Sequence, residues 1–499
     1  MVMFTKKPIW KMKPITIEGN IIHPSKTAKY LGVTLDDRLN FKEHIRNIST
    51  RAKNNIIKAT MAVGPTWGLT PKIALWIYRQ TVRPIITYAA SIWIRAIQNK
   101  HNAAKLRSVQ SLALRIATGA FPKTAGADLD MITNTTDIIH HIEKTATESA
   151  GRLKSTKHWT TEVHKYGTAT HSQRCNELWD ELSIPKQYPR DKVPKTIQDK
   201  KYTCKIDIED SINKKDEPNT ITVYTDGSKN TTKKVGLGAH SEHVEITISE
   251  NLPEHCTVFQ AEVMAVKRAA EELNEKKIEG KTIHIRSDST ACIRALDKRT
   301  TNSLTVQNCN KELNKLGSKN RVTIRWVKAH IGIPGNETAD DLAKEGCKQN
   351  TQQMPAPIPD SVIRNRTRLR ADKRTLDRFI ENGGKYTYRT AKDRDSWEKI
   401  RKQIGKFLKM RNKYRTATHL ITNIGPYNWY LKKIKKEPSS ICPLCNEEEE
   451  TVKHLICECP AMAYKRETLL NDVKYLNVST LLLTRLADVI KLAEHSAKM

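Results

Sequence analysis

The chain has 499 residues, too many for one ordinary hydrophobic core, and its length predicts about three domains. Lys and Arg number 86 against 54 Asp and Glu, so the formal net charge is +32, and a chain this basic is expected to bind a polyanion. With 38% hydrophobic and 28% charged residues, wholesale disorder is excluded. No apolar run in the sequence reaches the roughly 18 residues of a membrane-spanning helix, so no membrane partner is expected.

The N-terminus and the cysteines indicate an intracellular protein. Lysines interrupt residues 1–20, which lack the apolar core of a signal peptide. Ten cysteines, four of them between 442 and 459, fit a reducing compartment with one metal site better than a disulfide framework. The sequence does not separate nucleus from cytoplasm, because a basic cluster such as 432–436 is a weak localisation motif.

The positive charge is concentrated in two segments. Residues 1–218 carry a net charge of +16 and residues 351–440 carry +15, whereas 219–350 carry +3 and 441–499 carry −2. Proline clusters at 185–194 and 355–359 predict linkers on both sides of the nearly neutral segment. We therefore expect the flanks to contact a phosphate backbone without sequence specificity.

The N-terminal segment is predicted to be mostly α-helical after a short strand-like opening. Apolar residues recur at helical spacing over 43–64, 71–93 and 104–119. The string from Lys29 to Asp37, followed by Leu39, Phe41 and His44, resembles the end of the palm in reverse transcriptases of non-LTR retrotransposons. Residues 83–93 and 110–119 resemble the thumb that follows, so residues 1–125 are predicted to hold a truncated palm end and thumb-like helices.

Asp36 and Asp37 are not interpreted as the paired carboxylates of a polymerase. In that family the metal-binding aspartates precede the string that begins here at Tyr30, and almost nothing precedes it in this chain. We expect a surface turn at this position and no DNA polymerase activity, which primer extension by the purified protein would refute. The following residues, 126–218, are predicted to form a helical connection and linker.

The central segment, 219–350, is predicted to be an α/β domain with carboxylates at strand ends. Residues 221–226 alternate as a strand that delivers Asp226, and residues 281–287 form another strand, directly before Asp288. Two further strands are expected within 235–248. Because strand ends meet at one edge of an open α/β sheet, the two aspartates are expected to be neighbours.

Glu262 is predicted to lie on the apolar face of a helix over 259–273. An ionised carboxylate on such a face is costly unless it is protonated, paired with a cation or bound to a metal. Ser289 and Thr290 are expected to cap the helix after Asp288. A further strand over 321–328 leads to the loop of His330, and a last helix begins near Asn336.

Four strings in this segment occur in an order that resembles type 1 ribonuclease H. They are Thr225 to Ser228, Gln260 to Glu262, Ser287 to Ser289, and Trp326 to Ala343. The resemblance implies a five-stranded mixed sheet with helices over 219–350. It also implies that four carboxylates hold two Mg²⁺ ions, for which Mn²⁺ can substitute: Asp226, Glu262, Asp288 and Asp340.

The same resemblance implies that His330 assists proton transfer or product release. Asp341 adjoins Asp340 and is the residue most easily confused with it. The implied activity is endonucleolytic cleavage of the RNA strand of RNA/DNA hybrids, since the 2′-hydroxyl distinguishes RNA from DNA. The alternative is a catalytically silent, nucleic-acid-binding remnant of a retrotransposon polyprotein.

Two other families fit the central motifs less well. Gly236 and Gly238 lack a third glycine at Ser241, so the dinucleotide-binding fingerprint fails. A transposase or integrase would order its carboxylates Asp, Asp, Glu, whereas Glu262 comes second here. No extended basic substrate-binding loop is expected between 289 and 320, so the basic flanks would provide that contact.

The C-terminal segment is predicted to hold a zinc knuckle, 441–465, between a basic helical connector, 351–440, and a helical tail, 466–499. Three thiolates and an imidazole suit a tetrahedral structural Zn²⁺: Cys442, Cys445, His454 and Cys459. Cys457 is an alternative fourth ligand. The string resembles the knuckle after ribonuclease H in I-element- and jockey-like retrotransposons, so the chain resembles the C-terminal part of such a polyprotein, of open oligomeric state.

Overall fold

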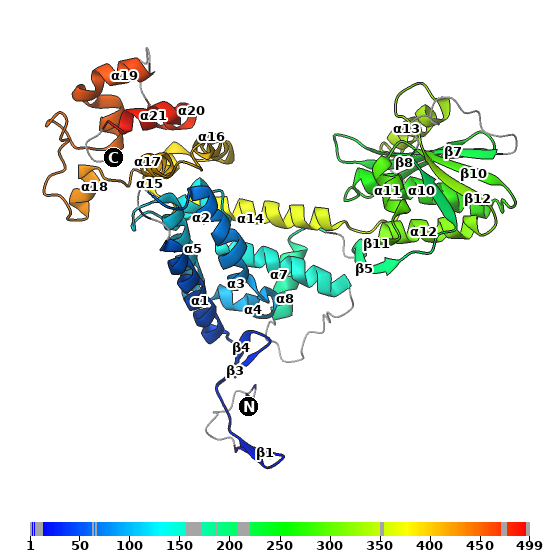
Figure 1. Ribbon diagram of the computed structural model, residues 1–499, viewed down its shortest axis with the longest axis horizontal. Helices are drawn as coiled ribbons and strands as arrows, with labels where there is room; N and C mark the ends of the chain where they lie inside the picture. Colours follow the sequence, from blue (N-terminus) through cyan, green and yellow to red (C-terminus); the bar gives the residue numbers. More distant parts are fainter. Residues whose placement is uncertain are drawn as a thin grey trace. The chain divides into compact units, whose positions relative to one another are not determined.

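The computed structural model (Figure 1) divides the chain into two compact units. Unit 1 comprises residues 1–150, 161–181 and 367–499, and unit 2 comprises 151–160 and 182–366. The residues that the structure describes are 2, 4, 13–61, 64, 67–155, 171–184, 188–206, 220–349, 354–470 and 477–495. Pro185 of the predicted linker lies outside these residues. None of the described helices is both long enough and apolar enough to cross a bilayer.

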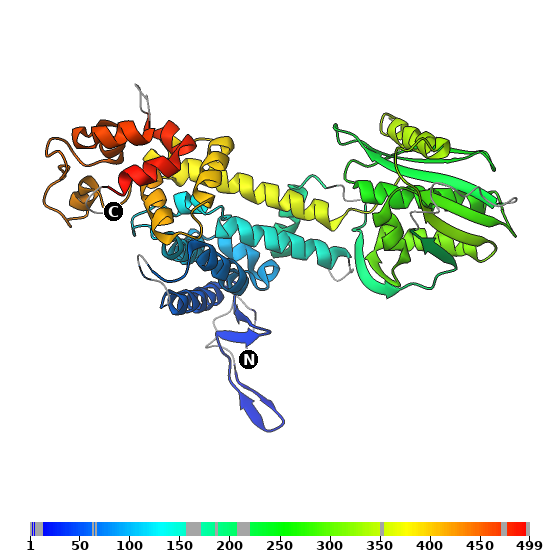
Figure 2. The ribbon, with the colours of Figure 1, turned by 45° about the horizontal axis from the view of Figure 1, so that its top comes forward.

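Unit 1 begins with two short antiparallel hairpins and continues as helices (Figure 2). The N-terminal elements are β1 Ile15–Ile17, β2 Asn20–Ile22, β3 Thr27–Tyr30, β4 Val33–Asp36, α1 Lys42–Thr60, α2 Pro71–Ile77, α3 Arg83–Thr87, α4 Ala90–Trp93, α5 Lys100–Thr118, α6 Gly126–Ile132, α7 Ile138–Ser155 and α8 His171–Asp180. The helical prediction is confirmed for α1 and α5. The predicted helix over 71–93 continues to Thr87 through a π-helical turn over Tyr78–Val82, with Pro84 in the first turn of α3, where a missing amide hydrogen is tolerated. It breaks at Tyr88, whose ψ is 131°, and Ala89, whose φ is 51°.

Asp36 forms a turn, as predicted. Its carboxylate accepts hydrogen bonds from the backbone amides of Arg38 (3.1 Å), Asn40 (2.9 Å) and Phe41 (2.6 Å). The carboxylate thus satisfies backbone donors where the chain leaves β4 for α1. This is a structural role.

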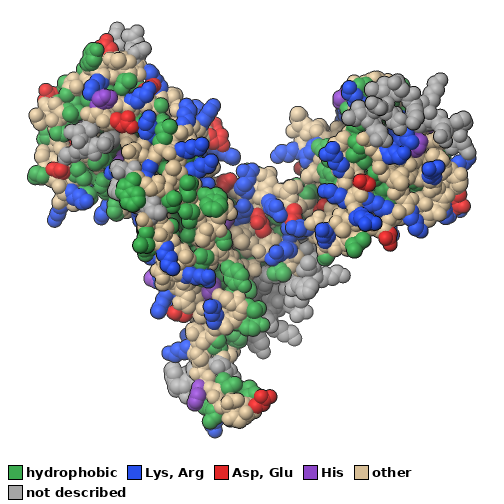
Figure 3. Space-filling view, in the orientation of Figure 1, with side chains coloured by type: hydrophobic (Ala, Val, Ile, Leu, Met, Phe, Trp, Pro, Cys, Tyr) green, Lys and Arg blue, Asp and Glu red, His purple; other side chains and the backbone are tan. Residues whose placement is uncertain are grey.

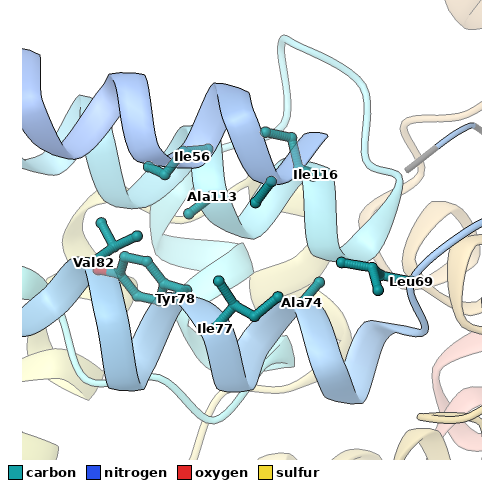
Figure 4. Close-up of a pocket in the computed structure, with 9 residues that line it drawn as sticks. Ile56, Leu69, Ala74, Ile77, Tyr78, Val82, Ala113 and Ile116 are labelled. Carbon is teal, nitrogen blue, oxygen red and sulfur yellow. The ribbon is translucent and has the colours of Figure 1, made fainter. Parts of the chain in front are cut away.

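The helices of the N-terminal segment pack tightly. Figure 4 shows apolar side chains of α1, α2, the π-helical turn and α5 converging on a cavity of about 20 Å³. Its lining consists of Ile56, Ala59, Leu69, Ala74, Ile77, Tyr78, Val82, Ala113 and Ile116. A cavity of this size without a charged lining residue is a packing defect rather than a chemical site.

The remaining helices of unit 1 come from the predicted connector and tail. They are α14 Asp360–Asn382, of which residues 367 onwards belong to unit 1, α15 Lys385–Thr390, α16 Arg394–Gly405, α17 Arg411–Thr422, α18 Asn428–Lys433, α19 Ala463–Leu470, α20 Val478–Thr484 and α21 Leu486–Ala493. They share an apolar core centred on Phe379, Trp397 and Tyr414.

Several arginines of the connector are paired inside unit 1. Arg378 Nη1 lies 2.7 Å from the buried Asp130 carboxylate, and Arg374 contacts Glu143 at 2.6 Å and Glu181 at 2.8 Å. Each of these acids belongs to the N-terminal segment. Part of the connector charge is therefore used in folding, and this reduces the charge available to an external polyanion.

Unit 2 contains a six-stranded mixed sheet in the order β6-β12-β10-β7-β8-β9. Its strands are β6 Tyr202–Lys205, β7 Thr220–Lys229, β8 Val235–Ser241, β9 Ile246–Leu252, β10 Thr282–Ser287 and β12 Arg321–Trp326. β6, β12, β10 and β7 are parallel neighbours, and β8 and β9 continue the sheet antiparallel.

Residues 219–350 supply five strands of this sheet, the number expected for them, and β6 adds a sixth from the segment that the sequence assigned to a linker. β6 is only four residues long, and its alternation of buried Tyr202 with exposed Thr203 and Lys205 is too short to stand out in a lysine-rich stretch. Tyr202 fixes the strand, since its hydroxyl donates to Asn310 Oδ1 at 2.6 Å.

Helices cover the two sides of the sheet unequally. α10 Val258–Glu275 packs on β7, β8 and β10, and α11 Thr290–Asp297 and α12 Leu304–Gly317 pack on β12 and β6. α13 Pro334–Gly346 packs on β7, β8 and β9 and lies on the opposite side from α10 (Figure 2). Between α11 and α12, β11 Thr300–Ser303 pairs with β5 Lys192–Ile197.

The two ends of unit 2 are fastened together. The Ile358 amide donates to the Pro189 carbonyl at 2.8 Å, and the Asp191 amide donates to the Ile358 carbonyl at 2.9 Å. Arg190 forms an ion pair with Asp360 beside this bridge. The proline-rich residues 355–359 therefore pair with residues near 190 instead of forming an isolated linker.

Candidate active site and candidate zinc site

Asp226 and Asp288 are neighbours, as the strand-end argument predicted. β7 and β10 are parallel, and Thr225 is paired with Ser287, the residue before Asp288. The Trp326 indole donates a hydrogen bond to the Asp288 carbonyl at 2.9 Å and fixes the chain where it leaves β10. The next helix begins with Ser289 as its cap, since the Ser289 hydroxyl accepts from the Cys292 amide at 3.3 Å.

Glu262 reaches the same place from α10. This helix starts with a capping box, in which the Thr257 hydroxyl accepts from the Gln260 amide and the Gln260 side chain accepts from the Thr257 amide. The helix lies directly on β7 at Gly227, where an added Cβ would stand 2.4 Å from the Glu262 nitrogen. Only glycine allows this approach, which brings Glu262 beside Asp226.

The three carboxylates form a compact group. One oxygen from each of Asp226, Glu262 and Asp288 can be chosen so that all lie within 4.8 Å of one another, a spacing that could hold a metal ion. Asp226 and Glu262 are buried and Asp288 is half-buried. Glu262 Oε2 is buried without a hydrogen-bond partner among the described residues.

Burial, and after it mutual repulsion, raises the carboxylate pKa values in this group. Burial, and then the charges of Asp288 and Asp340, raise the pKa of Asp226 to about 7. Burial, and then the charges of Asp226 and Asp288, raise the pKa of Glu262 to about 9, although a hydrogen bond from Ser287 opposes the shift. The pKa of Asp288 is also raised, by burial and by Asp340. At neutral pH, full ionisation of the group is therefore unfavourable unless a cation compensates the charge.

Asp340 approaches the group from α13. It raises the pKa of Asp226 through its charge and a side-chain hydrogen bond, while its own Oδ2 lies 2.7 Å from Lys344 Nζ. Asp340 is not within the 4.8 Å group that the other three acids form. Asp341 points outward with 80% of its side chain exposed. The structure thus distinguishes the two adjacent aspartates.

His330 lies on the exposed loop between β12 and α13. Its φ of 54° places a non-glycine residue in the left-handed region, and Gly332 follows with φ 81°. The imidazole is close enough to lower the pKa of Asp288 by its charge. The loop therefore brings the predicted histidine to the edge of the carboxylate group.

Sequence reasoning missed how two glycines position the site. Gly236 and Gly238 were considered only as a failed dinucleotide fingerprint, but both lie under α13. A Cβ at Gly236 would stand 2.4 Å from the Ala343 carbonyl oxygen, and one at Gly238 would stand 2.2 Å from that of Ala339. Their spacing of two along one strand was the available indication of a surface against which another backbone packs.

A second group of metal-ligand residues lies in unit 1. Ligand atoms of four residues lie within 4.8 Å of one another: Cys442, Cys445, His454 and Cys459. The Sγ atoms of Cys442 and Cys459 are 4.0 Å apart, and Cys445 Sγ is 3.4 Å from His454 Nε2. Cys457 is not a member of this group. The arrangement could hold a tetrahedral metal ion.

Glu448 supports the histidine of this second group. Its Oε2 lies 3.2 Å from His454 Nδ1, the nitrogen that does not face Cys445. Carboxylate contacts of this kind orient metal-binding histidines and fix their tautomer. The sequence alone did not indicate a partner for His454. The acidic turn over 447–450 provides that partner.

Comparison with known proteins identifies the central segment. The family model for RNase H matches residues 218–348. A ribonuclease H of Maricaulis maris (strain MCS10) is 30% identical over 150 residues, which cover 27% of this chain and 99% of the bacterial protein.

Other relatives are retrotransposon proteins of Drosophila melanogaster. The probable RNA-directed DNA polymerase from transposon BS is 28% identical over 141 residues, and the RNA-directed DNA polymerase from mobile element jockey is 28% identical over 106 residues. The matches cover 28% and 21% of this chain but only 15% and 11% of those proteins. Through residues 218–348 the chain belongs to the ribonuclease H family, and its homologues include the RNA-directed DNA polymerases of jockey-like, non-LTR retrotransposons.

Proposed function

We propose that the chain cleaves the RNA strand of RNA/DNA hybrids endonucleolytically, by a two-metal-ion mechanism, during retrotransposon reverse transcription. The observation that carries this proposal is the group of Asp226, Glu262 and Asp288, with oxygens within 4.8 Å of one another. The chain's membership of the ribonuclease H family supports the RNA/DNA hybrid as substrate, and its retrotransposon homologues support the context of reverse transcription.

The residues present fit bound divalent cations. Glu262 Oε2 is buried without a hydrogen-bond partner among the described residues, and the raised pKa values of Asp226 and Glu262 reflect burial and then repulsion, both of which a bound cation would offset. Hard carboxylate oxygens favour Mg²⁺, and Mn²⁺ suits the same ligands. The proposed ligands of the two ions are Asp226, Glu262, Asp288 and Asp340.

Bound Mg²⁺ would supply the electrostatic chemistry of phosphodiester hydrolysis, which activates water and stabilises the leaving 3′ oxygen. The proposed role of His330 is to take up or release a proton at the edge of the site, which its exposure and its charge interaction with Asp288 support. Lys344 compensates the charge of Asp340 when no cation does so. α10 and α13 lie on opposite sides of the sheet. α10 contributes Glu262, and α13 contributes Asp340.

Cleavage of an end-labelled RNA/DNA hybrid, with and without Mg²⁺, tests this function. We expect products from the RNA strand, restoration of cleavage by Mn²⁺, and a loss of about 100-fold or more in Asp288→Asn, which keeps the side-chain size but removes the charge. Equal cleavage by that variant contradicts the assignment. Binding of the hybrid without cleavage in either metal favours the silent remnant.

We also propose that Cys442, Cys445, His454 and Cys459 hold a structural Zn²⁺. Three thiolates and an imidazole complete a tetrahedral site and leave no open position for a substrate. The supporting observation is the short spacing of these ligand atoms together with Glu448 behind His454. Such an ion would stabilise the turn that joins α18 to the C-terminal helices.

A further inference from the structure

Half of one side of the unit 2 sheet is not covered by the described helices. α13 packs on β7, β8 and β9, whereas α10, α11 and α12 contact the strands from the other side. Along β12, Val322 and Ile324 point into the core beneath α11 and α12, so the alternating residues Arg321 and Arg325 lie on the uncovered side.

This uncovered side forms a hollow of about 960 Å³ with a strongly basic lining. Seven of its lining residues are Lys or Arg and none is Asp or Glu: Lys200, Lys201, Lys205, Lys281, Lys319, Arg321 and Arg325. Lys319 is paired with Glu279 at the rim. Three of the lysines come from the sequence before the ribonuclease H match. Cations that line one concave surface reinforce its positive potential.

Two donors in the hollow have no hydrogen-bond acceptor in the described part of the chain. Both are buried, but Lys200 Nζ lies over the Tyr202 ring, 5.8 Å from its centroid, so Arg325 Nε is the donor that calls for an anion. Buried donors are normally paired, so an anion's oxygen atoms are the missing complement. The hydroxyls of Thr203 and Thr323 share one hydrogen bond at 3.1 Å, so the pair leaves one neutral donor on the same surface.

The lining selects between partners of different chemistry. Its aromatic side chains are Tyr202, which is 6% exposed and hydrogen-bonded to Asn310, and His284, which is 8% exposed, so neither offers a surface on which a base could stack. Binding of single strands depends on such stacking, and protein interfaces depend on aromatic or apolar anchors. The hollow offers charge and hydroxyl donors, which are the groups that contact a duplex backbone.

We propose that this basic hollow binds the phosphate backbone of a nucleic-acid duplex, outside the carboxylate site. β10 runs from Thr282 in the hollow to Ser287, and Asp288 follows directly. Along the strand, Thr282 and Asp288 are therefore about 20 Å apart. About six nucleotides of one strand span that length. The hollow holds the substrate hybrid away from the scissile phosphate, and this last step rests on the proposed function.

Salt-dependent binding by the full chain tests the proposal. The hollow variant is the triple substitution Lys205→Gln, Arg321→Gln, Arg325→Gln. The control variant is Lys276→Gln, Lys311→Gln, Lys315→Gln, which removes the same charge from exposed positions just after α10 and on α12. The probes are a labelled 20-base-pair RNA/DNA hybrid and a labelled 20-base-pair DNA duplex, without added Mg²⁺. Figure 3 shows Lys and Arg widespread on the visible surface, so a charge-matched control is needed.

We expect the hollow variant to bind both duplexes about tenfold more weakly and to lower the slope of log affinity against log salt by about 2 to 3, since each lost phosphate contact removes about 0.9. The control should change the slope by less than about 1. The charge-retaining variant Arg321→Lys, Arg325→Lys should keep the wild-type slope. If the triple variant unfolds, the exposed single variant Arg321→Gln should still lower the slope by about 1.

Equal slopes for the hollow variant and the control overturn the proposal. An equal loss of affinity for a 20-nucleotide single strand overturns the choice of duplex. A chain that binds duplex through the hollow but cleaves no hybrid leaves this inference intact and rejects only the proposed nuclease function.

Discussion

Gly238 of β8 lies directly beneath Ala339 of α13, and a Cβ atom on Gly238 would stand 2.2 Å from the Ala339 carbonyl oxygen. Ala339 precedes Asp340, so this contact sets how closely the fourth carboxylate approaches Asp226, which is itself paired with Gly238 across the strands. A residue without any chemistry of its own thereby determines the geometry of the acidic group.

Gly238→Ala should displace α13 and reduce hybrid cleavage by about tenfold or more, because a methyl group cannot fit against helix backbone without a shift. The same overpacking should lower the free energy of unfolding of unit 2 by about 1–3 kcal/mol. Cleavage kinetics and denaturant unfolding measure the two effects. Gly405→Ala is the control, since its Cβ would meet nothing within 4 Å; equal effects of both substitutions would refute the packing argument.

Asp340→Asn should lower cleavage by about 100-fold, whereas Asp341→Asn should leave the rate within about twofold. The two residues are adjacent, but Asp340 interacts with Asp226 and Asp341 has 80% of its side chain exposed. Single-turnover cleavage of the hybrid separates them. The reverse ranking would move the fourth ligand to Asp341.

The stability of unit 2 should depend on pH and on Mg²⁺ together. In the unfolded chain the two acids lose their protons near pH 4, whereas in the folded chain the pKa values of Asp226 and Glu262 are about 7 and 9. Between about pH 4 and pH 9 the folded state thus binds more protons than the unfolded chain. The stability contributed by the protonated acids is therefore complete below about pH 4 and is lost as the pH rises through about 7 and 9.

Because Mg²⁺ requires ionised ligands, it should raise the unfolding temperature of unit 2 more at pH 8.5 than at pH 5.5. Calorimetry checks this on the transition that Gly238→Ala shifts. Glu262→Gln should flatten the pH dependence. Equal Mg²⁺ increments at both pH values would show that the cation does not bind these acids.

Cys459→Ser should remove bound zinc and destabilise the C-terminal helices, whereas Cys457→Ser should leave both unchanged. The structure includes Cys459 but not Cys457 in the four-ligand group. Metal analysis of the full chain should find about one zinc per molecule, and chelation should lower the stability of unit 1. Zinc retained by Cys459→Ser but lost from Cys457→Ser would assign the fourth ligand to Cys457.

A fragment of residues 188–366 should be more stable than one of residues 219–350, by about 3 kcal/mol or more. The shorter fragment lacks β6, which leaves Val322 and Ile324 on an open sheet edge, and it loses the buried Tyr202. It also lacks Asp191, which accepts from the Thr305 amide at 2.8 Å at the start of α12. Urea unfolding of both fragments measures the difference, and coincident midpoints would deny these residues a role.

The sequence predicted the positions that depend on local pattern. Asp226 and Asp288 follow alternating apolar residues, and Glu262 lies in a clear helical stripe, so their meeting at one sheet edge could be inferred. The four zinc-site residues were visible from their spacing, and the structure favours Cys459 over Cys457 because only the folded turn brings its sulfur within 4.0 Å of Cys442.

What could not be predicted depends on contacts between distant segments. Arg374 and Arg378 looked like charge available to a polyanion, but they pair with Glu143 and Asp130, more than 200 positions earlier in the chain. β6 is four residues long and is specified by its pairing with β12 rather than by its own composition. The spacing of Gly236 and Gly238 indicated a close backbone approach, but not that α13 makes it.

The pairing of Pro189 and Asp191 with Ile358, beside the ion pair of Arg190 and Asp360, brings the entry and the exit of unit 2 to one point. Unit 2 is in this respect an inserted domain: Arg366 at the end of its 182–366 body donates to the Leu182 and Ser183 carbonyls at the start, at 3.0 and 2.7 Å, while unit 1 continues on both sides in sequence. Such an insertion can be excised by joining its two stems with a short peptide, or replaced by a catalytically dead copy, without lengthening the path of the host chain. The nuclease and its helical host can thereby be varied separately.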